Sequence, residues 1–240
     1  DIVTAFNVFA HADNLKSIAN SAFKVLKSSG IFIIEVQYLL DTLKDVTFDN
    51  IYHEHVNYWS VSSLNEFCKL NNLNLVKVEH VETHGGSLRV YISKNVKSDI
   101  SVQTFLNQER DFGICKFSTY EKFANDVKNL KKNVLETVSK IKSDGKSIVG
   151  YGSPAKATTV LNYYGISYED IDYIIEDNEL KHNHFLPGMK IPIRSKKDAL
   201  NIKPDFILVL AWNFLDDIKL NNPDLVNSGC KFVTLRDLNW

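Results

Sequence analysis

Two hydrophobic stretches set the fold class early in the chain: Ile2-Val-Thr-Ala-Phe-Asn-Val-Phe9 and Ile31-Phe-Ile-Ile-Glu-Val36. Between them, residues 12–27 carry apolar side chains at helical spacing, and Gly30 follows as a helix stop. A strand, a helix and a strand in this order predict a right-handed parallel crossover. The second stretch is apolar on both faces, which is typical of a strand buried in an α/β fold.

The next residues predict the rest of the same domain. Residues 37–59 are rich in Tyr, His and Asp and predict an irregular segment, and Ser60 is a candidate cap for a helix ending at Leu70. Residues 73–81 and 87–93 alternate in polarity as antiparallel strands do. Thr83-His-Gly-Gly86 is the predicted turn between them.

A second α/β layer is predicted from the change in pattern near residue 98. Residues 117–141 have the spacing of one long amphipathic helix, which Asp144-Gly145 ends. Short apolar strands then alternate with helical stretches, which predicts a small parallel sheet. We therefore expect two domains, residues 1–97 and 98–240, the first being the later part of an α/β domain and the second a whole one.

The composition is that of an ordinary globular protein. The chain has 240 residues, of which 44% are hydrophobic and 24% charged, with a formal net charge of -1. Without a basic surplus we expect no nucleic-acid partner, and no apolar run approaches the roughly 20 residues of a membrane span. Cys68, Cys115 and Cys230 have no pairing or metal-ligand spacing, which indicates buried thiols in a reducing compartment such as the cytoplasm.

The first residue, Asp1, leads directly into a buried strand pattern, with no Met or targeting segment before it. Domains rarely begin on a central strand, so we expect the natural protein to carry a further N-terminal part. Motifs that belong to that part would be absent from this sequence.

The densest polar and aromatic cluster is Ile51-Tyr-His-Glu-His-Val-Asn-Tyr-Trp59, which follows a predicted core strand. Open α/β sheets place ligands at the carboxyl ends of their strands. A His beside a carboxylate can act as a general base, and a Tyr can stabilise an oxyanion. His and Glu also bind zinc, but His53 and His55 lack the one-turn spacing of a helical metal site. The alternative is a loop that only satisfies backbone hydrogen bonds.

Two other polar positions could belong to the same site. His11 directly follows the first predicted strand, so it would share the carboxyl edge of the sheet, unless it is merely a helix-entry residue beside Asp13 or Asn14. His84 and Arg89 flank the predicted Gly-Gly turn and could contact an anion, because Arg binds phosphate bidentately. A plain hairpin turn is the alternative there.

Gly150-Tyr-Gly-Ser-Pro-Ala-Lys156 follows a predicted strand and opens a helix, and it matches the GxGxxA form of a phosphate-binding turn. Its backbone N–H groups would face a phosphate, and Lys156 would add a charge. Glu176-Asp177 ends the next predicted strand, where a ribose-binding acid lies in NAD sites. A turn that only packs a helix on a strand explains the same pattern. Further on, Trp212 is expected in the core, and Asn213 is a candidate for recognising a sugar or base.

Five motifs in order resemble those of one enzyme family. They are Ile51-Tyr-His-Glu-His-Val-Asn-Tyr-Trp59, Thr83-His-Gly-Gly-Ser-Leu-Arg-Val90, Gly152-Ser-Pro-Ala-Lys-Ala-Thr-Thr-Val-Leu-Asn-Tyr-Tyr-Gly-Ile166, Leu186-Pro-Gly-Met-Lys-Ile-Pro-Ile193 and Leu210-Ala-Trp-Asn-Phe214. Together they resemble the S-adenosylmethionine-dependent sugar C-methyltransferases, which act on nucleotide-linked ketodeoxysugars. The resemblance covers essentially the whole chain.

The resemblance implies an α/β fold in which the later half of a Rossmann-like methyltransferase domain precedes a second Rossmann-like domain. It implies methyl transfer from S-adenosylmethionine to a ring carbon beside the ketone of the sugar, after a base removes the proton of that carbon. The resemblance implies Tyr52, Glu54, His55 and His11 as catalytic residues, with His55 the base. From the positions of the residues themselves, we expect Asn7 and Phe9 at the cofactor. We expect the nucleotide sugar at His84, Arg89, Gly152, Ser153, Lys156 and Asn213.

The sequence departs from this family at its front. The family's zinc-binding cysteines and glycine-rich cofactor loop are absent, so we expect both upstream of Asp1, and activity only in the full-length parent. Two alternatives stay open: an NAD-dependent enzyme that uses the turn at Gly150 with Glu176, and an inactive binding remnant. The sequence leaves the sugar, the nucleotide, the methylated carbon and the oligomeric state open.

Overall fold

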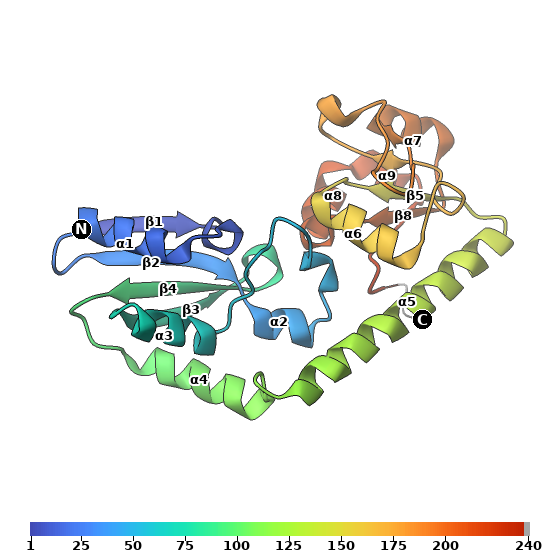
Figure 1. The fold of residues 1–240 in the computed structure, drawn as a ribbon. Coiled ribbons are helices and arrows are strands. Elements are labelled where there is room, and N and C mark those ends of the chain that lie inside the picture. Colours follow the sequence, from blue (N-terminus) through green and yellow to red (C-terminus); the bar gives the residue numbers. More distant parts are fainter. Residues whose placement is uncertain (238–240) are drawn as a thin grey trace. The chain divides into compact units, whose positions relative to one another are not determined.

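The computed structural model describes residues 1–237, which form two compact units (Figure 1). The first unit comprises Asp1–Thr47 and His53–Phe123, and the second comprises Phe48–Tyr52 and the chain from Ala124 onward. The sequence pattern changes near residue 98, whereas the units divide within the long helix α5, Phe117–Ser143. No helix in the described part of the chain is long and apolar enough to cross a membrane.

The first unit contains a four-stranded sheet in the order β1-β2-β4-β3 (Figure 1). Strands β1 (Ile2–Phe6) and β2 (Ile31–Gln37) are parallel and are joined through helix α1 (Leu15–Val25), which confirms the predicted crossover. Strands β3 (Asn74–Val81) and β4 (Ser87–Ser93) pair antiparallel, and β4 also pairs antiparallel with β2. The predicted hairpin is therefore confirmed.

The first strand is shorter than the apolar stretch that predicts it. It ends at Phe6, because Asn7 adopts a left-handed backbone with φ of 54°. A short 3₁₀ helix, η1 (Phe9–His11), follows, and the side chain of Asn14 then caps α1 by accepting the N–H of Ser17 at 3.0 Å. Asn7 thus turns the chain away from the sheet before His11.

The chain after β2 contains more helix than its sequence pattern predicts. Residues 37–59 were expected to be irregular, but they contain α2 (Leu39–Lys44) and the 3₁₀ turn η2 (Phe48–Asn50). Ser60 caps α3 (Val61–Leu70) as predicted, in a capping box with Ser63. Helix α4 (Ile100–Phe112) was not predicted. Its Glu109 is fully buried, and its carboxylate accepts the N–H groups of Val61 and Ser62 at the start of α3.

Strand β1 lies at the edge of the first sheet. Its free side has no partner strand among the described residues. Ile2 and Phe6 are 62% and 45% exposed, although the strand is almost entirely apolar. An exposed apolar edge strand is a ready template for further strands.

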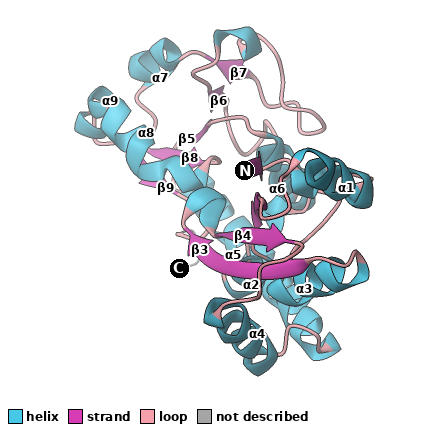
Figure 2. Ribbon diagram, turned by 90° about the vertical axis from the view of Figure 1, so that its left-hand side faces the viewer, coloured by secondary structure: helices cyan, strands magenta, loops and turns pink. Residues whose placement is uncertain are grey.

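The second unit contains a five-stranded parallel sheet in the order β7-β6-β5-β8-β9, which confirms the predicted parallel layer. Its strands are β5 (Ile148–Tyr151), β6 (Ile174–Ile175), β7 (Ile193–Arg194), β8 (Phe206–Val209) and β9 (Lys231–Val233). Its short helices are α6 (Ala155–Tyr164), η4 (Glu179–Lys181), α7 (Lys196–Ile202), η5 (Trp212–Phe214), α8 (Leu215–Asn221) and α9 (Pro223–Asn227). Buried side chains of α7, α8 and α9 join those of β5 and β8 in one core cluster. Figure 2 shows α8 and α9 next to strands β8 and β9.

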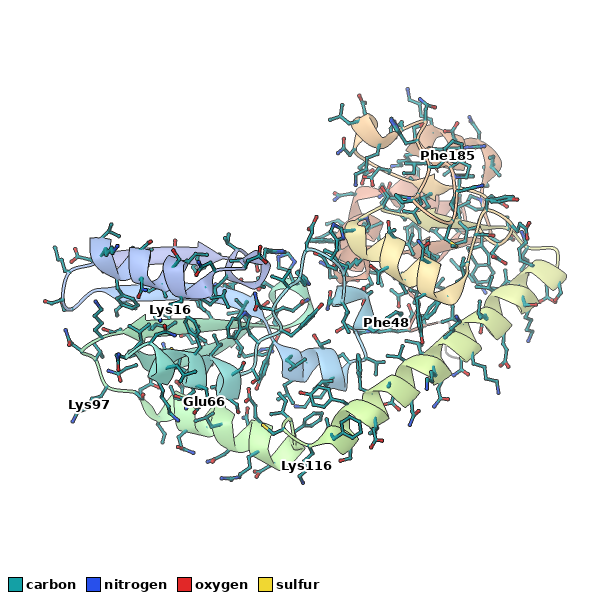
Figure 3. The ribbon with its side chains drawn as sticks, viewed as in Figure 1. Lys16, Phe48, Glu66, Lys97, Lys116 and Phe185 are labelled. Carbon is teal, nitrogen blue, oxygen red and sulfur yellow. The ribbon has the colours of Figure 1, made fainter. Side chains whose placement is uncertain are left out.

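The segment Phe48–Tyr52 belongs to the second unit although it lies between two parts of the first in sequence. The ring of Phe48 packs 5.1 Å from that of Tyr163 and 5.5 Å from that of Tyr164, both on α6 (Figure 3). Phe48, Asp49 and Asn50 are all buried. Aromatic packing against α6 therefore holds in place the residues that directly precede Tyr52.

All three cysteines are free thiols. Cys68 and Cys230 are buried, but Cys115 is exposed in the link between α4 and α5. The prediction of three buried thiols was therefore wrong at Cys115, because this short link lies on the surface.

Candidate functional site

The histidine loop, residues 53–58, lies on the segment that follows β1. Asn57 of this loop makes two hydrogen bonds to that segment. Its backbone N–H donates to the carbonyl of Ala10 at 3.2 Å, and its side-chain amide donates to the carbonyl of Ala12 at 2.9 Å. The loop and the segment after β1 are therefore neighbours, as expected for residues beyond the carboxyl end of a strand.

His11 and His55 lie side by side in this arrangement. Their ring centroids are 4.9 Å apart, and Nδ1 of His11 lies 2.8 Å from the carbonyl oxygen of Glu54. Because a carbonyl oxygen only accepts, Nδ1 of His11 donates its proton there. The neutral His11 ring then carries its lone pair on Nε2, so this histidine can accept a proton at that atom.

The neighbours of His55 are aromatic. Tyr58 meets the His55 ring edge-on at 6.5 Å, and burial raises the pKa of the Tyr58 phenol. The Glu54 carboxylate lies 3.9 Å from Nε2 of His53, and both side chains are exposed. Tyr52 belongs to the other compact unit. The structure therefore brings together His11, the Glu54 backbone and His55 from the predicted catalytic set.

Arg89 is bonded to a buried carboxylate. Its Nε and Nη2 donate to Oε2 of Glu35 at 3.0 and 2.8 Å, and Thr83 donates to Oε1 of the same residue at 2.8 Å. Glu35 lies on β2 directly opposite Arg89 on β4, with its side chain 4% exposed. Arg89 therefore neutralises a buried carboxylate, which is a structural role that the sequence pattern did not predict.

The predicted Gly-Gly turn has strict backbone requirements. His84 is exposed and adopts φ of 54°, and Gly86 adopts φ of 111°. A Cβ atom on Gly86 would lie 2.2 Å from Oδ2 of Asp41, which itself is bonded to His80 at 2.7 Å. The Asp41 side chain therefore leaves no room for a Cβ atom at Gly86. Nothing in the sequence around the turn indicates this contact.

The two residues expected at the cofactor differ in placement. Asn7 is exposed just beyond β1, where a ligand could reach its side chain. The Phe9 side chain is fully buried and stacks 5.6 Å from Trp59, so only its backbone could meet a cofactor. Among residues 1–97, no glycine-rich turn joins a strand to a helix.

In the second unit, the turn after β5 is occupied by a side chain of the protein itself. The backbone N–H of Ser153 donates to Oε2 of Glu176 at 2.9 Å, the Ser153 hydroxyl donates to the same atom, and Lys181 lies 3.3 Å away. Burial alone would raise the pKa of Glu176, but these bonds and the Asn178 N–H lower it to about 2. The predicted anion-binding amide of Ser153 is thus already bonded to a carboxylate.

Lys156 and Asn213 come together, as the sequence analysis expected of two residues in one site. The Lys156 ammonium donates to Oδ1 of Asn213 at 2.6 Å and lies 4.4 Å from the ring centroid of Trp212. The pKa of Lys156 is lowered, chiefly because burial disfavours its charge; Asp49 opposes this effect and Arg236 adds to it.

Lys156 and Asn213 belong to a second cluster, which also contains Trp212, Asp49 and Arg236. The sequence pattern predicted no site role for these last three residues. Trp212 was expected in the core, but its indole N–H donates to the Asp49 carboxylate at 2.6 Å, and Arg236 lies 4.7 Å from its ring centroid. Asp49 and Arg236 have no motif around them. Only their charge could have indicated a role, since Asp49 lies 163 positions from Trp212 and Arg236 comes from a later segment of the chain.

A cavity of about 340 Å³ lies beyond the carboxyl ends of β5, β6 and β8. Gly152, Ser153, Glu176 and Asp177 line it, whereas Lys156 and Asn213 do not. Gly152 adopts φ of 82°, and a Cβ atom there would lie 3.1 Å from that of Ala211. The cavity therefore has an acidic wall, separate from the cations around Trp212.

Both halves of the chain match known methyltransferase families. Residues 82–235 match a family described as the C-methyltransferase C-terminal domain, and residues 1–78 match a methyltransferase domain family. C-methyltransferase NovU of Streptomyces niveus is 33% identical over 228 residues, which is 94% of this chain and 54% of that relative. The chain thus spans about half the length of the curated relative it matches. Because the first family covers most of its residues, the chain belongs to the C-methyltransferases.

Proposed function

We propose that this chain is part of an enzyme that transfers a methyl group from S-adenosylmethionine to a ring carbon of a nucleotide-linked deoxysugar. The carbon lies beside the ketone of the sugar. The observation that carries the proposal is the histidine loop bonded to the segment after β1, with the His11 and His55 rings 4.9 Å apart. Family membership supports methylation of a carbon atom.

The proton beside a ketone requires a base whose pKa lies near neutrality, and imidazole meets this requirement. In the proposed mechanism, a ring nitrogen of His55 takes the proton, and the electron pair of the C–H bond passes into the enolate. S-adenosylmethionine supplies an electrophilic methyl group for the carbon. A positioned base contributes roughly 100- to 10,000-fold to the rate.

The other residues of the first cluster have supporting roles in this proposal. Tyr52 stabilises the enolate oxygen by hydrogen bonding, and Glu54 holds His11 through its carbonyl. His11 then keeps Nε2 as a second proton acceptor near His55. Tyr52→Phe should slow methyl transfer while leaving the fold intact, because only a hydroxyl is lost.

We also propose that the methyl-donor site is completed by chain that precedes Asp1. The exposed apolar edge of β1 supports this, because further strands of a methyltransferase sheet would cover Ile2 and Phe6. Asn7 remains a candidate contact of the cofactor. Zinc would likewise belong to the preceding part of the protein.

The candidate contacts of the nucleotide sugar differ in how well they are placed within their own unit. His84 remains a candidate contact, whereas the charge of Arg89 is paired with Glu35. In the second unit, Lys156 and Asn213 are better placed than Gly152 and Ser153, because Glu176 occupies the turn. The NAD-dependent alternative is supported only by the acid at the end of β6.

The proposed function is tested with the full-length parent protein. A ketodeoxysugar nucleotide tritiated at the acceptor carbon should release tritium to water. A methyl group should replace the lost hydrogen only when S-adenosylmethionine is present, which mass spectrometry of the unlabelled sugar detects as a net gain of CH2. Absence of both effects would contradict the proposal and favour an inactive remnant. Calorimetry with NAD tests the alternative enzyme.

A further inference from the structure

Two cations share the indole of Trp212 in the second unit. The Lys156 ammonium lies 4.4 Å and the Arg236 guanidinium 4.7 Å from the ring centroid. Contact with a π face stabilises each cation but does not cancel its charge, and the Asp49 carboxylate bonded to the indole offsets only one of the two. In the part of the chain that the structure describes, no carboxylate lies at ion-pair distance from Lys156 or Arg236.

The surroundings of Lys156 disfavour its positive charge. Burial lowers its pKa most, Arg236 lowers it further, and Asp49 only partly compensates. Lys156 is half-buried, and a lysine that loses hydration inside a protein is normally paired with an anion. The cluster therefore has one excess positive charge that an incoming anion would neutralise.

The free donors of the cluster suit phosphate oxygens. Oδ1 of Asn213 accepts from Lys156 at 2.6 Å, so the Asn213 amide nitrogen keeps its N–H donors for another partner. Lys156 has three N–H donors, of which one is used here. Arg236 is exposed and adds a planar guanidinium, which binds phosphate oxygens in pairs.

The turn after β5 is a poorer anion site than its sequence suggests. The Ser153 N–H, the Ser153 hydroxyl and the Lys181 ammonium all bond to the Glu176 carboxylate. A phosphate at this turn would meet a carboxylate that is held ionised, and like charges at short range repel.

We infer that Lys156, Arg236 and Asn213, arranged around Trp212, bind a phosphate or diphosphate group. As the subsite for the diphosphate of a nucleotide sugar, this assignment rests on the proposed function. As an anion site it is measurable by itself, because all of its residues lie in one compact unit.

The test is calorimetry of the 240-residue chain with two probes, inorganic pyrophosphate and thymidine diphosphate. Both should bind the wild-type chain, and tighter binding of the nucleotide would identify it as the source of the phosphate. Lys156→Met and Arg236→Gln should each weaken binding by about tenfold or more. Asp49→Asn should tighten it by about threefold, because one repelling charge is removed.

Lys181→Met is the matched control, because it removes the cation at the turn after β5. It should leave both affinities unchanged. Weaker binding in Lys181→Met with unchanged binding in Lys156→Met and Arg236→Gln would place the anion at the turn and overturn the inference. Failure of both probes to bind the wild-type chain would overturn it as well. Arg236 is exposed, so Arg236→Gln gives a result even where Lys156→Met lowers the melting temperature.

These outcomes are separable from the proposed function. Anion binding that depends on Lys156 and Arg236, in a parent protein that transfers no methyl group, would keep the anion site and reject the reaction. Methyl transfer with an unchanged KM for the nucleotide sugar in both variants would keep the reaction and reject the subsite.

Discussion

The indole N–H of Trp212 donates a 2.6 Å hydrogen bond to the carboxylate of Asp49, which lies 163 positions away in sequence. Asp49 is buried, and it directly precedes the stretch that contains Tyr52 and His55. Together with the packing of Phe48 on α6, this bond fixes residues 48–52 to the second unit. The chain that leads into the histidine loop is therefore anchored through Asp49, which no motif indicates, to Trp212.

Trp212→Phe should destabilise the protein by about 1–3 kcal/mol, because it leaves the buried Asp49 carboxylate without its donor. Urea denaturation measures the loss, and hydrogen exchange should become faster at the amides of residues 48–52. Asp49→Asn keeps an acceptor for the indole and should lose less stability than Asp49→Ala. Equal losses in the two Asp49 variants would reject the hydrogen bond as the source of the effect.

Gly86→Ala should destabilise the chain by about 3 kcal/mol or more, because its Cβ would lie 2.2 Å from Asp41 in a left-handed backbone. Gly145→Ala is the matched control: Gly145 also has positive φ, at 72°, but a Cβ there meets nothing within 4 Å. Its cost should be about 1 kcal/mol of backbone strain. Thermal denaturation compares the two, and similar losses would show that contact with Asp41 is unimportant.

Arg89→Met should cost about 3 kcal/mol, because the Glu35 carboxylate would stay buried without its cation. The double variant Glu35→Gln/Arg89→Met should recover most of this loss. Recovery would identify Arg89 as a structural partner of Glu35. An unchanged stability in Arg89→Met would instead leave the guanidinium available for substrate.

Glu176 predicts a defined loss of stability in acid. Its pKa is about 2 in the folded chain and ordinarily 4.5, so the folded state binds the proton less readily than the unfolded state. The stabilisation is complete above about pH 4.5 and is lost as the pH falls towards 2, with a total of about 2 kcal/mol. Glu176→Gln should lose this pH dependence in denaturation measurements between pH 5 and 2. An identical acid transition in the variant would contradict the assignment.

Local patterns were sufficient to predict the order of the main elements. The β1–α1–β2 crossover, the β3–β4 hairpin and the Ser60 cap depend on neighbouring residues, which the sequence displays directly. Asn7 shortens β1 against its apolar pattern, since a single left-handed residue overrides hydrophobicity. Helix α4 has a weak apolar stripe, and contacts such as those of Glu109 with α3 stabilise it.

In the candidate sites too, features that depend on neighbouring residues were predicted, whereas contacts between distant residues were not. The motif around His55 identified the first cluster, because its residues are contiguous apart from His11. The partners Glu35 for Arg89 and Glu176 for Ser153 came from other strands, and each changed the expected role of a predicted ligand contact. Such pairings depend on sheet order and register, which local sequence does not encode.

The central claim is that His55 removes the proton from the acceptor carbon, and its most direct measurement is methyl transfer by His55→Ala in the full-length parent. The account predicts a rate about 100- to 10,000-fold below wild type, with S-adenosylmethionine still bound and tritium release from the labelled sugar lost in parallel. His53→Ala, in the same loop with a side chain 83% exposed, should stay near the wild-type rate. Methyl transfer by His55→Ala at a near wild-type rate would contradict the claim.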